Sequence, residues 1–205
     1  MPIIDNKNTN KESEGFKAAS QYFQNQVEYA YIPNGIVGQL MVPEIGLGAL
    51  NLMGAIMNEN SQVGPELKML IAYMTSYAKG CTYCQTATYS AARDGMGDSE
   101  KFAKIWEYPS SDLFSDGERA ALDIALAAAA SPSDVTDEMR DKLKQHYNQT
   151  ECAEIIAMIA LFAYFNAWND TNGTLMDDSS IEIAEKEIRA TGKLDEEKFE
   201  KLRGA

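Results

Sequence analysis

The segment from Ala153 to Trp168 constrains the fold most, because Glu154 and Asn166 are its only conventionally polar residues. A helix that is apolar on nearly every side has to be covered by other helices or by another subunit. At 16 residues, the segment is shorter than the roughly 20 apolar residues that a membrane-spanning helix needs. We therefore expect a central core helix or a subunit-interface helix, and no membrane as a partner.

The rest of the chain is also helical in pattern. It contains no alternating run of β-branched residues bounded by turns, which is the pattern of a strand. Apolar residues recur instead at helical spacing, for example over 11–29. We predict an all-α protein that forms a homo-oligomer, because a chain of this size has limited core in which to hide an apolar helix. Its expected parts are a disordered N-terminus over 1–10, one helical domain over 11–176, and a charged helical tail or peripheral arm over 177–205.

The charge of the chain excludes several kinds of partner. The 205 residues have a net charge of −13, and no block of Lys or Arg interrupts the acidity. Nucleic acid and anionic membrane surfaces are therefore not expected as partners. The polar start of the chain, from Met1 to Ser13, lacks the apolar core of a signal peptide, and the three cysteines are an odd number. We expect a reducing, cytoplasmic setting, in which a Cys-x-x-Cys pair is more often catalytic than structural.

Two cysteines, Cys81 and Cys84, lie three residues apart, directly after a helix that Gly80 is expected to end. A second helix predicted over 82–93 puts both sulfurs in its first turn, where unpaired N–H groups and the helix dipole favour a thiolate. Thiolate is the form that attacks peroxides and disulfides, and a Cys-x-x-Cys loop is short enough to close into a disulfide. The spacing therefore indicates a redox dithiol, with Thr88 one turn after Cys84 on the same helix face.

Two other interpretations of the cysteine pair stay open at this stage. The cysteines could be inert and buried, or they could form half of a metal site. A tetrahedral zinc site would need every thiol and imidazole in the chain, which are Cys81, Cys84, His146 and Cys152. We expect no metal and no cofactor, and we expect the lone Cys152 to pack rather than react.

Five short runs of sequence point to a known family. They are YIPN at 31–34, VPE at 42–44, PELKMLIA at 65–72, GCTYC at 80–84 and LFAYFNAWND at 161–170. These runs resemble the carboxymuconolactone decarboxylase and alkylhydroperoxidase D (AhpD-like) family, and the likeness extends over about residues 30–175. The resemblance implies an all-helical bundle that assembles into dimers, trimers or hexamers, with the redox pair near subunit contacts.

The same resemblance implies a peroxide-reducing or disulfide-exchange activity, with a small peroxide as substrate and a thiol or a protein as electron donor. In redox members of the family, the second cysteine meets the peroxide and the first resolves the sulfenic acid, which corresponds to Cys84 and Cys81. Those members also have a proton relay, with a histidine and a glutamate at the positions of Thr88 and Met69 in this chain. Glu66, one turn before Met69, either replaces the relay glutamate or stabilises the helix dipole from the first turn.

Three functions follow from these residues. The first is a thiol-dependent peroxidase or disulfide reductase that uses Cys84 and Cys81. The second is a decarboxylase, which needs acid and base groups but no cysteine pair, so the Cys-x-x-Cys motif and the single histidine count against it. The third is a catalytically silent oligomer, which the missing relay groups at Met69 and Thr88 keep open.

Overall fold

The chain folds into helices. The computed structural model describes residues 1–26 and 31–204, and these residues form helices and connecting segments without a strand. The all-α expectation is confirmed, while the end of the first helix, predicted near Tyr29, lies outside the described residues. The α-helices are α1 (Glu14–Gln26), α2 (Asn34–Val37), α3 (Pro43–Ile56), α4 (Pro65–Ala78), α5 (Thr82–Ala91), α6 (Ser99–Ala103), α7 (Asp116–Ala129), α8 (Asp137–His146), α9 (Gln149–Asn172), α10 (Asp178–Ile183) and α11 (Glu196–Leu202).

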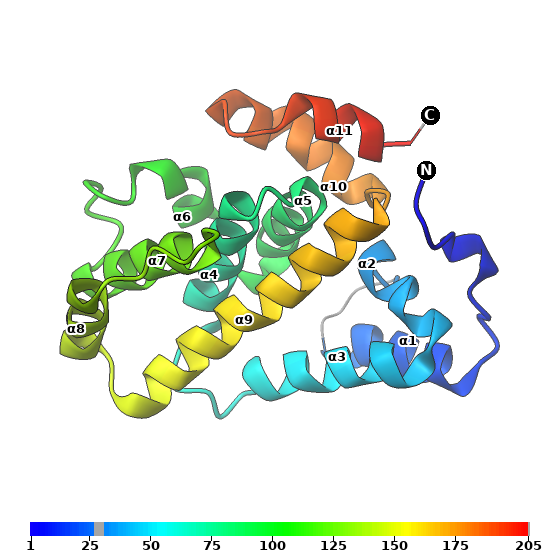
Figure 1. Ribbon diagram of the computed structural model, residues 1–205, viewed down its shortest axis with the longest axis horizontal. Coiled ribbons are helices and arrows are strands. Elements are labelled where there is room, and N and C mark those ends of the chain that lie inside the picture. Colours follow the sequence, from blue (N-terminus) through cyan, green and yellow to red (C-terminus); the bar gives the residue numbers. More distant parts are fainter. Residues whose placement is uncertain (27–30, 205) are drawn as a thin grey trace.

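Helix α9 is the axis of the fold and runs diagonally across the molecule in Figure 1. It begins after Asn148, which forms a capping box with Glu151, and it ends at Gly173 in the left-handed conformation (φ 66°). Both caps lie outside the apolar segment, so α9 has 24 residues and is longer than the apolar pattern predicts. Its length and composition alone would suffice to cross a membrane, as is true of many core helices.

Helices on both sides cover α9. Helices α4, α5 and α7 pack along one side, and α2 and α3 pack along the other, where α1 lies against α3 (Figure 1). Helix α4 is deeply buried, and seven consecutive side chains in it, from Leu70 to Ser76, have no exposed surface. Leu52 on α3 and Ile156 on α9 remain about half exposed, which fits the expected homo-oligomer; the oligomer stays a prediction.

The N-terminal residues pack against the end of α9, which corrects the expected disorder over 1–10. The backbone N–H of Ile3 donates to the carbonyl oxygen of Asn172 at 2.9 Å, and the N–H of Ile4 donates to Asn172 Oδ1 at 2.7 Å. The hydroxyl of Thr9 donates to the carbonyl of Val37 at 3.2 Å. A polar segment is thus held by backbone hydrogen bonds, which an apolar periodicity does not reveal.

The segment 177–205 also packs on the helical body, which corrects its expected role as a peripheral arm. Helix α10 lies against α5, and the side chains of Ala184, Ile188 and Phe199 have no exposed surface. The turn from Ala184 to Ile188 is a π-helical turn. Because such a turn shifts the helical period, the apolar positions do not repeat as in a regular α-helix, and the segment looks only weakly amphipathic in the sequence.

Glu154, which interrupts the apolar sequence of α9, forms a charged cluster with the buried Lys68 at the edge of the core. Its Oε2 lies 2.9 Å from the Nζ of Lys68 on α4, a side chain that is 1% exposed. Glu154 also accepts hydrogen bonds from the backbone N–H groups of Gln62 and Val63, each at 3.0 Å, and from the hydroxyl of Ser61. The cluster ties α9 to α4 and to the connection that precedes α4.

Candidate active site

The two cysteines lie at the start of α5, where the chain turns sharply out of α4. Gly80 has a φ of 70°, a conformation that favours glycine, and it joins the end of α4 to Cys81. Cys81 is the N-cap of α5, and its Sγ accepts the N–H of Cys84 at 3.3 Å. A sulfur therefore occupies the place that a serine or aspartate oxygen usually takes at a helix start, where N–H groups favour a thiolate.

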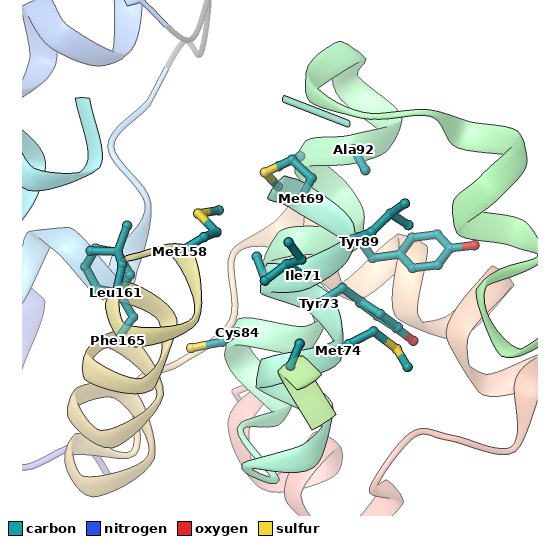
Figure 2. Packing of buried hydrophobic residues seen from close by; sticks show 14 of the residues in the cluster. Met69, Ile71, Tyr73, Met74, Cys84, Tyr89, Ala92, Met158, Leu161 and Phe165 are labelled. Atoms are coloured by element: carbon teal, nitrogen blue, oxygen red, sulfur yellow. The ribbon is translucent and has the colours of Figure 1, made fainter. Parts of the chain in front are cut away.

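The Cys84 sulfur projects from α5 toward α9, where Met158, Leu161 and Phe165 pack (Figure 2). Cys84 is 3% exposed, and the side-chain amide of Asn169 on α9 donates to its Sγ at 3.4 Å. Burial and the adjacent Cys81 raise the pKa of the Cys84 thiol well above its usual value, while the Asn169 hydrogen bond opposes this rise. The resting site therefore favours a protonated Cys84, which has to lose its proton before it can attack.

Cys84 opens into an apolar cavity of about 130 Å³ between α3, α4, α5 and α9. Thioether and aromatic side chains make up nearly half of the residues in its walls. They include Met53, Met57, Met69, Met158, Phe162 and Phe165. A cavity with such walls suits an apolar organic substrate, because methionine and aromatic side chains adapt to apolar groups and offer few hydrogen bonds.

The two positions of the family's relay both line this cavity, but neither side chain there exchanges protons near neutral pH. The hydroxyl of Thr88 donates to the carbonyl oxygens of Cys84 at 2.9 Å and Gln85 at 3.0 Å, so it is bonded to its own helix. Met69 has no titratable group. Glu66, the alternative candidate for the relay, is solvent-exposed in the first turn of α4 and does not line the cavity, a position that fits its other expected role of stabilising the helix dipole.

A polar group that the sequence analysis missed lies in the wall of the same cavity. The hydroxyl of Tyr83 donates to Asp177 Oδ2 at 2.8 Å and accepts the backbone N–H of Gly35 at 2.8 Å. The backbone N–H of Asn34 donates to Asp177 Oδ1 at 2.9 Å. Burial raises the pKa of Asp177, although the hydrogen bonds from Asn34 and Tyr83 oppose this effect. One feature of the sequence could have indicated this group, namely that Tyr83 lies between the two cysteines.

The Cys81 side of the pair faces a second cavity, of about 210 Å³, which is covered by α11. Lys198 and Lys201 of α11 line it together with Asp170. The Nζ of Lys198 donates to Asp170 Oδ1 at 2.6 Å and to the carbonyl of Gly80 at 3.0 Å. The two sulfurs therefore open into different cavities. In the part of the chain that the structure describes, no three metal-binding side chains gather.

The fold and the cysteine pair define the class of protein: the chain has the AhpD-like fold. A peroxidase-related protein of Ralstonia eutropha with an alkylhydroperoxidase AhpD core is similar at a TM-score of 0.71 and 19% identity, over 88% of this chain and 93% of that one. The debrominase Bmp8, as a Cys→Ala variant bound to 2,3,4-tribromopyrrole, is similar at a TM-score of 0.78 and 24% identity, over 86% of this chain and 93% of Bmp8.

Two curated proteins are similar in sequence. The uncharacterised protein YnjA of Escherichia coli is 29% identical over 109 residues, which are 53% of this chain and 60% of YnjA. The uncharacterised protein YdfG of Bacillus subtilis is 26% identical over 113 residues, which are 54% of this chain and 74% of YdfG. The chain thus spans less than two thirds of YnjA. No family model matches the chain.

Proposed function

We propose that this protein is a thiol-dependent reductase of apolar hydroperoxides, in which Cys84 attacks the substrate and Cys81 resolves the oxidised sulfur. The observation that supports this most is the Cys84 sulfur in the wall of an apolar cavity, with Cys81 in the same first turn of α5. The AhpD-like fold of a peroxidase-related protein supports the same class of reaction.

The reaction has three steps. The Cys84 thiolate attacks the outer oxygen of the hydroperoxide, the O–O bond breaks, and the alkoxide leaves as an alcohol after it takes a proton. The Cys81 thiolate then attacks the sulfur of the Cys84 sulfenic acid, which forms the disulfide and releases water after protonation. Two thiol groups of an electron donor finally reduce the disulfide to the two cysteines and become a disulfide themselves.

Oxidation of the reduced protein by tert-butyl hydroperoxide is the test. We expect a mass loss of two hydrogens that maps to the peptide with Cys81 and Cys84 and that a dithiol reductant reverses, because the pair lies within one helical turn. The Cys152→Ser variant is the control and should behave like the native protein. Oxidation that maps to Cys152 instead, or a Cys-x-x-Cys pair that stays reduced, would contradict the proposal.

Reductive dehalogenation is the second candidate, and the apolar cavity together with the similarity to the debrominase Bmp8 favours it. In that reaction two thiols would supply the electrons, so a carbon–bromine bond becomes a carbon–hydrogen bond while a disulfide and bromide form. If the protein is a dehalogenase, 2,3,4-tribromopyrrole and a dithiol should yield free bromide at a rate that Cys84→Ser abolishes. Bromide release that is equal in the native protein and in this variant would rule the candidate out.

A further inference from the structure

The site needs a proton carrier, because a protonated Cys84 cannot attack and an alkoxide is a poor leaving group. Neither Thr88 nor Met69 can serve. We propose that Asp177, acting through the hydroxyl of Tyr83, takes the proton from the Cys84 thiol and returns it to the leaving oxygen of the substrate. This inference rests on the proposed function and names the acid and base of the same site.

The geometry places this pair where the proton is needed. Cys84, Tyr83 and Asp177 all line the apolar cavity, and Asp177 is 7% exposed. Its carboxylate accepts one hydrogen bond on each oxygen, from Tyr83 and from Asn34. A buried carboxylate in an apolar wall is costly to keep charged, which is the condition under which a carboxyl group exchanges protons near neutral pH.

Close packing holds the residues that lie between the Asp177 carboxylate and the Cys84 sulfur in place. A Cβ added at Gly35 would lie 2.9 Å from Tyr83 Cε1 and 2.8 Å from Asn169 Oδ1, so a larger residue there would displace one of these side chains. Asn169 in turn donates to the Cys84 sulfur. The cluster of Cys84, Asn169, Gly35, Tyr83 and Asp177 is therefore contiguous, although its members come from α2, α5, α9 and the residue before α10.

The proposed proton path balances over one turnover. No hydrogen bond joins Cys84 and Tyr83 directly, so a water molecule in their shared cavity carries the proton of the Cys84 thiol to the Tyr83 oxygen. The Tyr83 proton passes to Asp177 at the same time, which leaves a thiolate and a neutral carboxyl group. After the thiolate attacks, the alkoxide takes a proton from Tyr83 and Asp177 returns its proton to Tyr83. The charged and titratable groups around Asp177 are Tyr83, Tyr31 and Asp178, and the charge of Asp178 adds to the effect of burial in raising the Asp177 pKa.

Two oxidants distinguish proton delivery by Tyr83 and Asp177 from any other effect of these two residues. Both tert-butyl hydroperoxide and peracetic acid need the Cys84 thiolate, but only the first has a leaving oxygen that needs a proton, because peracetic acid releases acetate. In Tyr83→Phe, the rate of Cys84 oxidation by the hydroperoxide relative to the peracid should fall at least ~10-fold, since a positioned acid or base contributes ~10²–10⁴ in rate. Asp177→Asn should lower the same ratio.

The matched control is Tyr108→Phe, which removes a similar tyrosine–aspartate hydrogen bond, from Tyr108 to Asp123 at 2.6 Å, outside both cavities. It should leave the ratio unchanged. Equal slowing of both oxidants in Tyr83→Phe and Asp177→Asn would show that Tyr83 and Asp177 deliver no proton to the leaving oxygen, and would overturn the proton path while leaving the proposed function standing. A native protein that reduces neither oxidant would overturn the proposed function and the path with it.

Discussion

Replacing Cys84 with serine is expected to abolish hydroperoxide turnover, down to the rate of the buffer. A serine hydroxyl in this cavity cannot take the place of the thiolate, because a hydroxyl is a much weaker nucleophile, and Asp177 is the single carboxylate among the described residues that line the cavity. The measurement is consumption of tert-butyl hydroperoxide in the presence of a dithiol. Cys152→Ser is the matched control, since that cysteine lies at the start of α9, away from both cavities, and should keep the native rate.

The Cys81→Ser variant distinguishes the two sulfurs. If Cys84 attacks and Cys81 resolves, this variant should consume one equivalent of hydroperoxide per chain and stop at a sulfenic acid on Cys84. The opposite pattern, with an active Cys84→Ser and an inert Cys81→Ser, would reverse the roles. The reversed roles would also have a physical reason. The Cys81 sulfur accepts a helix N–H, and this hydrogen bond favours the thiolate form.

The largest loss of stability is expected for Glu154→Ala. The change leaves the Lys68 ammonium without its carboxylate while that side chain is 1% exposed, and it also removes the acceptor of the Gln62 and Val63 N–H groups. Breaking a buried ion pair from one side typically costs ~3–5 kcal/mol, so we expect a fall of that size in the free energy of unfolding measured with urea.

Two further variants show whether the charge is the cause. The double variant Lys68→Met with Glu154→Ala should recover most of the loss, because no unpaired charge then remains inside. Glu197→Ala breaks an exposed ion pair with Lys201, in which both side chains are more than half exposed, and should change the free energy of unfolding by less than ~1 kcal/mol. A loss in Glu154→Ala no larger than that of Glu197→Ala would contradict the role of the cluster.

The hydrogen bonds to Glu154 also determine how the free energy of unfolding should change at acidic pH. Burial acts to raise the pKa of Glu154, but hydrogen bonds from Ser61, Val63, Gln62 and Lys68 outweigh it and lower the pKa from 4.5 to about 2. A folded-state pKa below the unfolded value means that the stabilisation is complete above pH 4.5 and is lost as the pH falls toward 2. Glu154→Ala should remove this part of the acid dependence.

The sequence determined the fold class and the place of the cysteine pair, because both depend on local signals. Helical periodicity, Pro65 at a helix start and Gly80 at a helix end act within a few residues, and they put the cysteines at the start of α5. The apolar composition of 153–168 similarly identified the helix that became the axis of the fold.

The surroundings of the sulfur were decided by the tertiary structure. Asn169 is 85 residues from Cys84 in the chain, and Asp177 is 94 residues from Tyr83. Asp177 also lies in a segment that the sequence presents as a charged tail. Helical spacing indicates which side chains share a face, but not which other helix that face meets. The packing of α5 against α9 and α10 therefore brings the amide and the carboxylate to the cysteine pair.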